Sequence, residues 1–190
     1  AGHFYKKHML PVEQVAELLS MIAEEKKISF DKEYAEQLYL SYNARRRAND
    51  DPVISSLTSI IKGKKVLLVA PGKRLTEADS TIRKALDDAD TISISLNAFD
   101  KYETDFVLTT RIDAFNNAVS ANKKIIATSG ITDKSDENVL VIDYEKWVTV
   151  EKSVNDSSGI VALKLFSACG AKEILLAGFG GQGILFSGKF

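Results

Sequence analysis

The chain has 190 residues, 45% of them hydrophobic, which suits one domain with a full core plus a small appendage. Lysines and arginines (25) balance aspartates and glutamates (26), and this net charge of −1 without a long basic patch argues against nucleic-acid binding. The single cysteine, Cys169, excludes an internal disulfide, and no apolar run reaches the roughly 18 residues that cross a membrane, so we expect a cytoplasmic protein.

The N-terminal segment carries two helical patterns. Apolar residues follow Pro11 at the spacing of an amphipathic helix, namely Val12, Val15, Leu18, Leu19 and Ile22. A second helix is expected from Asp31, placed as its N-cap, to Arg45. The stretch 48–52 is rich in Asn, Asp and Pro, which interrupt regular structure, so we expect a linker there. Residues 1–50 are therefore expected to form a helical extension, and residues 53–190 an α/β domain.

Beyond residue 53, apolar runs of strand length alternate with segments of helix length. The run Val66–Ala70 is entered through lysines and broken by Pro71-Gly72, which is typical of a strand buried on both faces of a parallel sheet. The expected order is helix 53–62, strand 65–70, helix 76–88, strands 91–96 and 105–109, helix 111–121, strands 124–128 and 138–142, helix 157–169 and strand 173–178. Strands separated by helices imply right-handed crossovers, so the pattern predicts a Rossmann-like three-layer sandwich with a mostly parallel sheet.

Small or polar residues follow most of these strands. In an open α/β sheet, ligands bind beyond the carboxyl ends of the strands, so these positions are the first candidates for a site. Such residues allow close backbone approach and hydrogen bonding to a ligand, but strand-to-helix turns also use them as caps, and both interpretations stay open. The sets are Pro71-Gly72-Lys73-Arg74, Asn97, Thr109-Thr110-Arg111, Thr128-Ser129-Gly130 and Gly178-Phe179-Gly180-Gly181.

The helix expected over 157–169 is apolar almost all round, which indicates deep burial. Its start, Ser157-Ser158-Gly159, would direct free backbone N–H groups at the strand ends, an arrangement that binds anions. Either serine can equally act as the N-cap, and the two roles are compatible. Cys169 on the same helix is expected to be an unreactive core thiol.

Motifs for catalysis and dinucleotide binding are weak. The segment 178–183 has the G-x-G-x-x-G spacing of the dinucleotide fingerprint, but only seven residues follow it, too few for the helix and strand that the fingerprint requires. Both histidines, His3 and His8, precede the α/β domain. We therefore expect neither a Ser/His/Asp arrangement nor a zinc site in that domain.

Three stretches of the chain resemble a known family. Leu68-Val69-Ala70-Pro71-Gly72-Lys73, the segment 157–163 and the segment 171–179 are similar to the C-terminal domain of aldolases of the HMG-CoA-lyase-like (DRE-type TIM barrel) family, found in bacterial polysaccharide loci. The resemblance extends to the N-terminal helices, through Lys26-Lys27 and the segment 31–34. It implies that this sequence is a piece of a longer chain whose upstream barrel carries the lyase chemistry and its divalent metal. The piece itself is then expected to hold no catalytic residue and no cofactor.

The α/β part is also distantly similar to bacterial sialyltransferases, which use CMP-sugar donors, and to hydroxymethylpterin diphosphokinase-like domains. In those families the first-strand glycine turn and a Thr/Ser-Ser-Gly helix start contact the nucleotide phosphates and sugar. The resemblance therefore implies ligand-binding roles for Gly72, Asn97, Ser157, Ser158 and Gly159. Lys73 and Arg74 stand where the sialyltransferases have a small turn, and we expect this basic pair to hold an anion by charge.

We therefore expect an accessory C-terminal domain of an aldolase that binds a nucleotide or sugar phosphate and is not itself catalytic. The expected partners are that ligand, the upstream aldolase barrel and a second copy of the chain in a homo-oligomer, with neither nucleic acid nor membrane. Two alternatives stay open. One is a nucleotide-sugar-dependent transferase, and the other is a non-catalytic assembly domain whose N-terminal helices dock the barrel or a second subunit.

Overall fold

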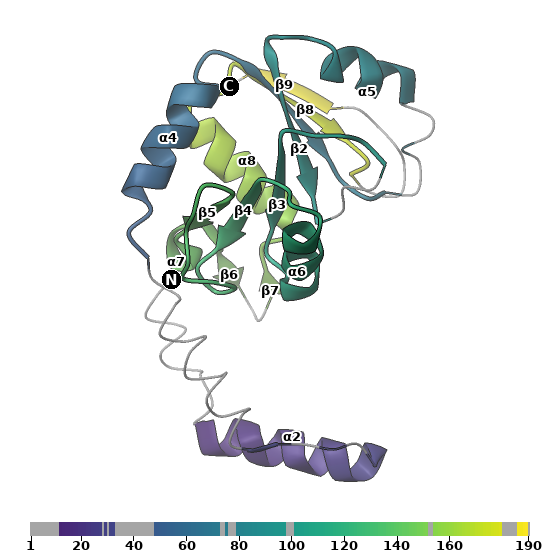
Figure 1. Ribbon diagram of the computed structural model, residues 1–190, viewed down its shortest axis with the longest axis vertical. Coiled ribbons are helices and arrows are strands. Elements are labelled where there is room, and N and C mark those ends of the chain that lie inside the picture. The colour runs from purple at the N-terminus through teal and green to yellow at the C-terminus, as the bar shows by residue number, and fades with distance from the viewer. Residues whose placement is uncertain are drawn as a thin grey trace.

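The computed structural model describes residues 12–27, 29, 31–32, 48–72, 75, 79–97, 101–151, 154–179 and 186–189 (Figure 1). The first elements are α2 (Val12–Lys26), α4 (Asp51–Ile61), β1 (Lys65–Val69), α5 (Asp79–Leu86), β2 (Thr91–Leu96), β3 (Phe106–Thr109) and α6 (Ile112–Ser120). They are followed by β4 (Ile125–Thr128), β5 (Val139–Ile142), α7 (Tyr144–Trp147), β6 (Val150–Glu151), β7 (Val154–Asn155), α8 (Ser158–Ala168), β8 (Glu173–Ala177) and β9 (Phe186–Lys189).

The sheet confirms the expected α/β class. Its seven strands lie in the order β5-β4-β3-β2-β1-β8-β9, and the first six of these run parallel. β9 pairs with β8 in the antiparallel sense. From β1 the chain adds strands on one side as far as β5, and it then returns to place β8 on the other side of β1. The strand order therefore reverses between β1 and β8, where doubly wound folds form a ligand crevice.

Helices cover both faces of the sheet, so the fold is a Rossmann-like three-layer sandwich. Side chains alternate along a strand, and β1 accordingly sends Leu68 to one face and Leu67 to the other. The first face packs against α4 and α8, where Phe166 is fully buried. The second face is covered by α5 through Ile82 and by α6 through Ala118. Figure 1 shows α4 and α8 on one side of the sheet and α5 and α6 on the other.

The alternation of helices and strands in the α/β domain agrees with the sequence pattern. The bounds differ slightly, since α4 begins at Asp51 and β3 at Phe106. The sequence did not predict α7, the β6–β7 hairpin or β9, because elements this short do not show a period. β9 also bears on the glycine motif over 178–183. The next residues that the structure describes after Phe179 form a strand antiparallel to β8, where the dinucleotide fingerprint requires a helix.

The structure describes part of the N-terminal extension. α2 confirms the helix expected after Pro11, and it lies apart from the sheet in Figure 1. It exposes large apolar side chains, namely Leu18, Leu19, Met21 and Ile22. The second expected helix, from Asp31 to Arg45, lies almost entirely outside the described residues.

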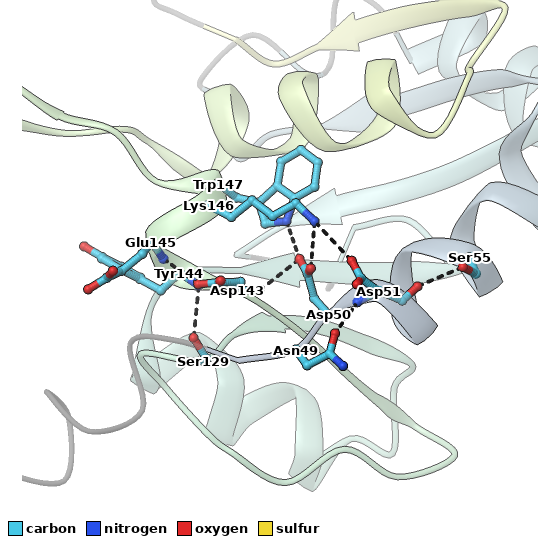
Figure 2. Close-up of polar contacts among 10 residues, drawn as sticks. All are labelled: Asn49, Asp50, Asp51, Ser55, Ser129, Asp143, Tyr144, Glu145, Lys146 and Trp147. Carbon is cyan, nitrogen blue, oxygen red and sulfur yellow. Dashed lines mark hydrogen bonds and ion pairs between the residues drawn. The ribbon is translucent and has the colours of Figure 1, made fainter. Parts of the chain in front are cut away.

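The carboxylate of Asp50 joins α4 to α7 (Figure 2). Asp50 lies in the stretch expected to be a linker, yet only 2% of it is exposed. Its carboxylate accepts hydrogen bonds from donors on or next to α7, namely the Lys146 ammonium (2.8 Å), the Trp147 indole (2.5 Å) and the Asp143 backbone N–H (3.2 Å). Burial of a charge is costly unless it is paired and hydrogen-bonded, and these donors meet that requirement.

The start of α7 is also fixed to the turn after β4. The Ser129 hydroxyl accepts a hydrogen bond from the Tyr144 backbone N–H at 3.0 Å (Figure 2). The Asp143 carboxylate caps the helix by accepting from the Glu145 N–H at 2.9 Å. α7 therefore sits at the carboxyl edge of the sheet in a fixed position, even though it is only four residues long.

Candidate functional site

Polar side chains from β2, β3 and α8 meet at the carboxyl edge of the sheet. Asn97 follows β2, and its Nδ2 donates to the Ser158 hydroxyl at 3.0 Å, at the first turn of α8. The Thr110 and Ser158 hydroxyl oxygens lie 2.8 Å apart. The Thr109 hydroxyl donates to Asn97 Oδ1 at 2.9 Å. Two strand ends and a helix start that are distant in sequence thus form one hydrogen-bonded network, which we call the strand-end network (Asn97, Thr109, Thr110 and Ser158).

The backbone of Asn97 explains how its side chain reaches this network. Its φ is +62°, in the left-handed region that asparagine tolerates better than most residues. Its N–H donates to the Leu108 carbonyl of β3 at 3.1 Å, which holds the turn against the neighbouring strand. The amide therefore points from the end of β2 toward α8.

The N-terminus of α8 supplies a positive end to the same place. Ser157 is the N-cap, and its hydroxyl accepts from the Ile160 N–H at 3.5 Å. Ser158 and Gly159 are buried in the first turn of this helix of 11 residues. First-turn N–H groups have no partner within their own helix, and the helix dipole adds partial positive charge, so this end favours an anion.

Glycines at the ends of β1 and β8 pack against each other. A Cβ on Gly72 would lie 2.1 Å from the Gly178 carbonyl oxygen, and a Cβ on Gly178 would lie 2.1 Å from the Ala70 carbonyl oxygen. Gly178 also has a φ of +73°. Gly72 therefore makes its close approach to the backbone of the neighbouring strand end. Lys73 and Arg74 lie outside the described residues, so their anion-binding role stays a prediction.

Gly159 makes a similar close approach to Phe179. A Cβ on Gly159 would come within 2.5 Å of the Phe179 ring, which packs against the core from the segment after β8. The structure thus brings Asn97 and Ser158 into contact and places Ser157 beside them as the cap. It sets Gly72 against Gly178 and Gly159 against Phe179.

A small pocket adjoins the strand-end network. Its volume is about 120 Å³, and it is lined by residues from the ends of β3 and β4, from α7 and from the entry to α8: Thr110, Thr128, Gly130, Ile131, Tyr144, Val148 and Asp156. Thr128 is 1% exposed, and its hydroxyl has no hydrogen-bond partner among the described residues. Sequence reasoning noted Thr110 and Thr128 as strand-end residues without naming them as site residues. Their position directly at a strand end was the available signal.

Asp156 forms the charged wall of this pocket. Its carboxylate accepts a hydrogen bond from the Thr149 backbone N–H at 2.9 Å. It also forms an ion pair with the ammonium group of Lys164 in α8. Burial raises the pKa of this carboxyl, but the hydrogen bonds from Lys164 and Thr149 outweigh burial and hold the pKa below its usual value. Asp156 is therefore ionised at neutral pH, and Lys164 balances its charge.

A larger groove lies at the opposite edge of the sheet, near the amino ends of β2, β3 and β4. Its volume is about 790 Å³. Two ion pairs lie along or beside it, since Lys123 lies 2.7 Å from Glu103 and Asp88 lies 3.0 Å from Lys65. Open α/β sheets bind ligands at the carboxyl edge, so the strand-end network and its pocket form the candidate site.

The described part of the chain offers neither a metal-binding cluster nor a membrane-spanning helix. No cluster of three or more His, Cys, Asp or Glu residues there could hold a metal ion. None of the described helices combines the length and apolar character that a membrane crossing needs. Comparisons of the whole chain with protein-family models and with curated proteins gave no match.

Proposed function

We propose that the carboxyl edge of the sheet binds a phosphorylated ligand, either a nucleotide or a sugar phosphate, and that the domain acts by binding rather than by catalysis. The observation that carries this proposal is the strand-end network at the N-terminus of α8. Its hydrogen-bonding groups are neutral amides and hydroxyls, and they meet at the positive end of a helix. Such a combination suits phosphate oxygens, which accept hydrogen bonds and carry negative charge.

A second, independent observation supports a ligand at this edge. Thr128 lines the adjoining pocket, and its buried hydroxyl is unpartnered among the described residues. Buried polar groups in folded proteins nearly always have a partner, so an unpaired one beside a pocket is consistent with a ligand or water that completes it. Lys73 and Arg74, which follow β1 in the sequence, would add positive charge to the same edge.

A thermal-shift titration tests the proposal. The probes are inorganic phosphate, pyrophosphate, CMP, AMP and glucose 1-phosphate, each at millimolar concentration. We expect at least one phosphorylated probe to raise the melting temperature, and Ser158→Ala to reduce that shift. Ser167→Ala is the matched control, because Ser167 lies in the last turn of the same helix, at its negative end. If no probe raises the melting temperature of the wild-type protein, the proposal is wrong.

Incubation of the same protein with a CMP-sugar distinguishes binding from sugar transfer. A nucleotide-sugar-dependent transferase would release CMP from a CMP-sugar, with or without an acceptor. We expect binding of the nucleotide without release, which chromatography of the incubated mixture measures. Steady release of CMP that Ser158→Ala abolishes would replace this proposal with the transferase alternative.

The proposed place of this domain in a longer aldolase rests on the sequence resemblance. In that arrangement the lyase chemistry and its divalent metal belong to an upstream barrel, and the α/β domain supplies ligand recognition. Sequencing the native transcript upstream of Ala1 tests this part. A coding sequence for a barrel would support it, and an unrelated upstream sequence would remove the aldolase while leaving the binding proposal intact.

A further inference from the structure

We propose that the pocket lined by Thr128 and Tyr144 receives an uncharged polar ring of the phosphorylated ligand, and that the Thr128 hydroxyl hydrogen-bonds to the edge of that ring. This inference rests on the proposed function, which places the phosphate at the N-terminus of α8. The shared chemistry is a compact neutral ring with hydrogen-bonding groups at its edge. A nucleobase and a sugar ring both have it.

The Thr128 hydroxyl is the first reason. It belongs to a residue that is 1% exposed, at the carboxyl end of β4, and that residue lines the pocket. The hydroxyl has no hydrogen-bond partner among the described residues. A threonine hydroxyl can donate one hydrogen bond and accept others. It can therefore pair with either an acceptor or a donor at the edge of a bound ring.

The size and walls of the pocket are the second reason. Its volume of about 120 Å³ is close to the roughly 150 Å³ of an apolar cavity known to hold one benzene ring. Ile131, Tyr144 and Val148 provide apolar surface, while Thr110 and Thr128 provide hydroxyl groups. Apolar walls with a few placed polar groups are the usual composition of a small-molecule site. α7, which carries Tyr144, is fixed by Asp50 and Ser129, so this wall is already in position (Figure 2).

The charges around the pocket and around the N-terminus of α8 indicate which part of the ligand each would bind. No Lys or Arg is among the described residues that line the pocket, and the Asp156 carboxylate there is already paired with Lys164, so the pocket holds no free positive charge for a phosphate, whereas an uncharged ring needs none. Thr110 connects the pocket to the phosphate position, because it lines the pocket and its hydroxyl lies 2.8 Å from that of Ser158. A ring and a phosphate in one molecule can therefore reach both places at once.

Isothermal titration calorimetry on the full chain tests this inference. Pyrophosphate is the probe without a ring, CMP carries a base and a ribose, and glucose 1-phosphate carries a pyranose. We expect one of the ring-bearing probes to bind more tightly than pyrophosphate. We also expect Thr128→Val to weaken that probe about fivefold, the size of one net hydrogen bond, while pyrophosphate binding stays unchanged.

Two further variants control for indirect effects. Thr128→Ser keeps the hydroxyl and should retain the tighter binding of the ring. Thr132→Val removes a hydroxyl four positions further along, one that accepts from the Lys134 N–H and does not line the pocket, and should leave all probes unaffected. A gain in affinity for CMP alone identifies the ring as part of a nucleoside, and a gain for glucose 1-phosphate alone identifies it as a pyranose.

The outcomes separate this inference from the proposed function. Pyrophosphate binding with no gain from either ring would overturn the ring site and leave the phosphate site standing. Equal binding of the ring-bearing probe by wild type and Thr128→Val would likewise overturn it, since the pocket would then hold water only. Failure of every probe to bind wild type would overturn both proposals. The wild-type comparison requires no substitution, so it decides the matter even if Thr128→Val disturbs folding.

Discussion

The indole nitrogen of Trp147 donates a hydrogen bond to the carboxylate of Asp50 at 2.5 Å, across 97 positions of sequence. This bond ties the start of α4 to the end of α7. α7 also carries Tyr144, a wall of the pocket next to the strand-end network. The hydrogen bonds of Asp50 therefore help to hold the Tyr144 wall of the pocket in place.

Asp50→Asn is expected to lower the free energy of unfolding by about 2 to 3 kcal/mol, the scale of a lost hydrogen bond to a charged group in a buried position. An asparagine can still accept from the Trp147 indole, but its amide NH₂ would face other donors, the Lys146 ammonium and the Asp143 N–H. Urea unfolding followed by tryptophan fluorescence measures the change, because Trp147 is the only tryptophan in the chain.

Asp51→Asn is the matched control for that experiment. Asp51 is the next residue, lies 3.8 Å from the same Lys146 ammonium, and has a side chain that is 84% exposed. An exposed ion pair contributes little, so we expect a change within about 0.5 kcal/mol. Equal losses of unfolding free energy from the two substitutions would mean that burial does not increase the contribution of Asp50 to stability.

Stability at low pH should depend on Asp50. Burial raises the pKa of this carboxyl, but hydrogen bonds from Lys146, Trp147 and Asp143 outweigh burial and lower the pKa below its ordinary value of 3.8. The folded state therefore binds the proton more weakly than the unfolded state does. The stabilisation by Asp50 is complete above the ordinary pKa and is lost as the pH falls through the lower folded pKa.

The pH experiment compares wild type with Asp50→Asn by urea unfolding from about pH 7 down to about pH 2. We expect the difference in unfolding free energy between the two proteins to shrink in acid. Asp143 has the opposite shift, since burial, with a smaller effect of the nearby Asp50 charge, raises the pKa of its carboxyl. Asp143 is present in both proteins, so the comparison largely removes it. A constant difference across this range would contradict the lowered pKa of Asp50.

Gly178→Ala is expected to destabilise the fold by more than roughly 3 kcal/mol, because the added methyl group would meet backbone that has to move. Its Cβ would lie 2.1 Å from the Ala70 carbonyl oxygen at the end of β1. Gly63 has a similar positive φ of +78°, but a Cβ there meets nothing within 4 Å. Gly63→Ala should therefore cost only about 1 kcal/mol, from the left-handed conformation alone. Thermal unfolding measures the loss of stability in both variants. Equal losses would refute the steric argument.

Two substitutions at Asn97 separate its backbone from its amide. Asn97→Gly keeps the left-handed conformation and loses the hydrogen bonds to Ser158 and Thr109, at an expected cost of about 1 kcal/mol. Asn97→Ala loses the same bonds and also strains the backbone at φ +62°, so it should cost about 1 kcal/mol more. Chemical denaturation measures both, and an alanine variant as stable as the glycine variant would exclude the strain.

The thiol of Cys169 should be unreactive in the folded protein. It is fully buried, and burial raises the pKa of the thiol, so little thiolate is present at neutral pH. We expect a thiol-specific reagent to label this cysteine only at the rate of unfolding, and to label it rapidly in denaturant. Rapid labelling under native conditions would show that α8 opens locally.

The sequence predicted the sheet and its main helices because buried strands and amphipathic helices have local periods. Leu67 and Leu68 in β1, for example, belong to a short apolar run that ends at Pro71-Gly72, and its length and this boundary indicate a buried strand. Asn97 was expected at the carboxyl edge because it follows a strand, and Ser158 because the start of its helix would face the strand ends. The structure brings the two into hydrogen-bond contact, and their role in ligand binding stays a prediction.

Features that have no local period could not be predicted from the sequence. Asp50 looks like part of a polar linker, and its burial depends on Trp147, which only the folding of the intervening sheet brings near. In the sequence, Thr128 looks like the polar end of a strand. Its hydroxyl is unpaired because the elements packed around it place no hydrogen-bonding group within reach among the described residues.

The amino-acid sequence by itself determined the layers and the order of the main elements, because local patterns encode these. Only the tertiary structure decided that Gly72 packs on Gly178 rather than standing open, that α7 exists and is held by Asp50, and that a pocket lies beside Thr128. The physical reason is that close packing and hydrogen-bond pairing are made between residues far apart in the chain, and no local pattern contains them.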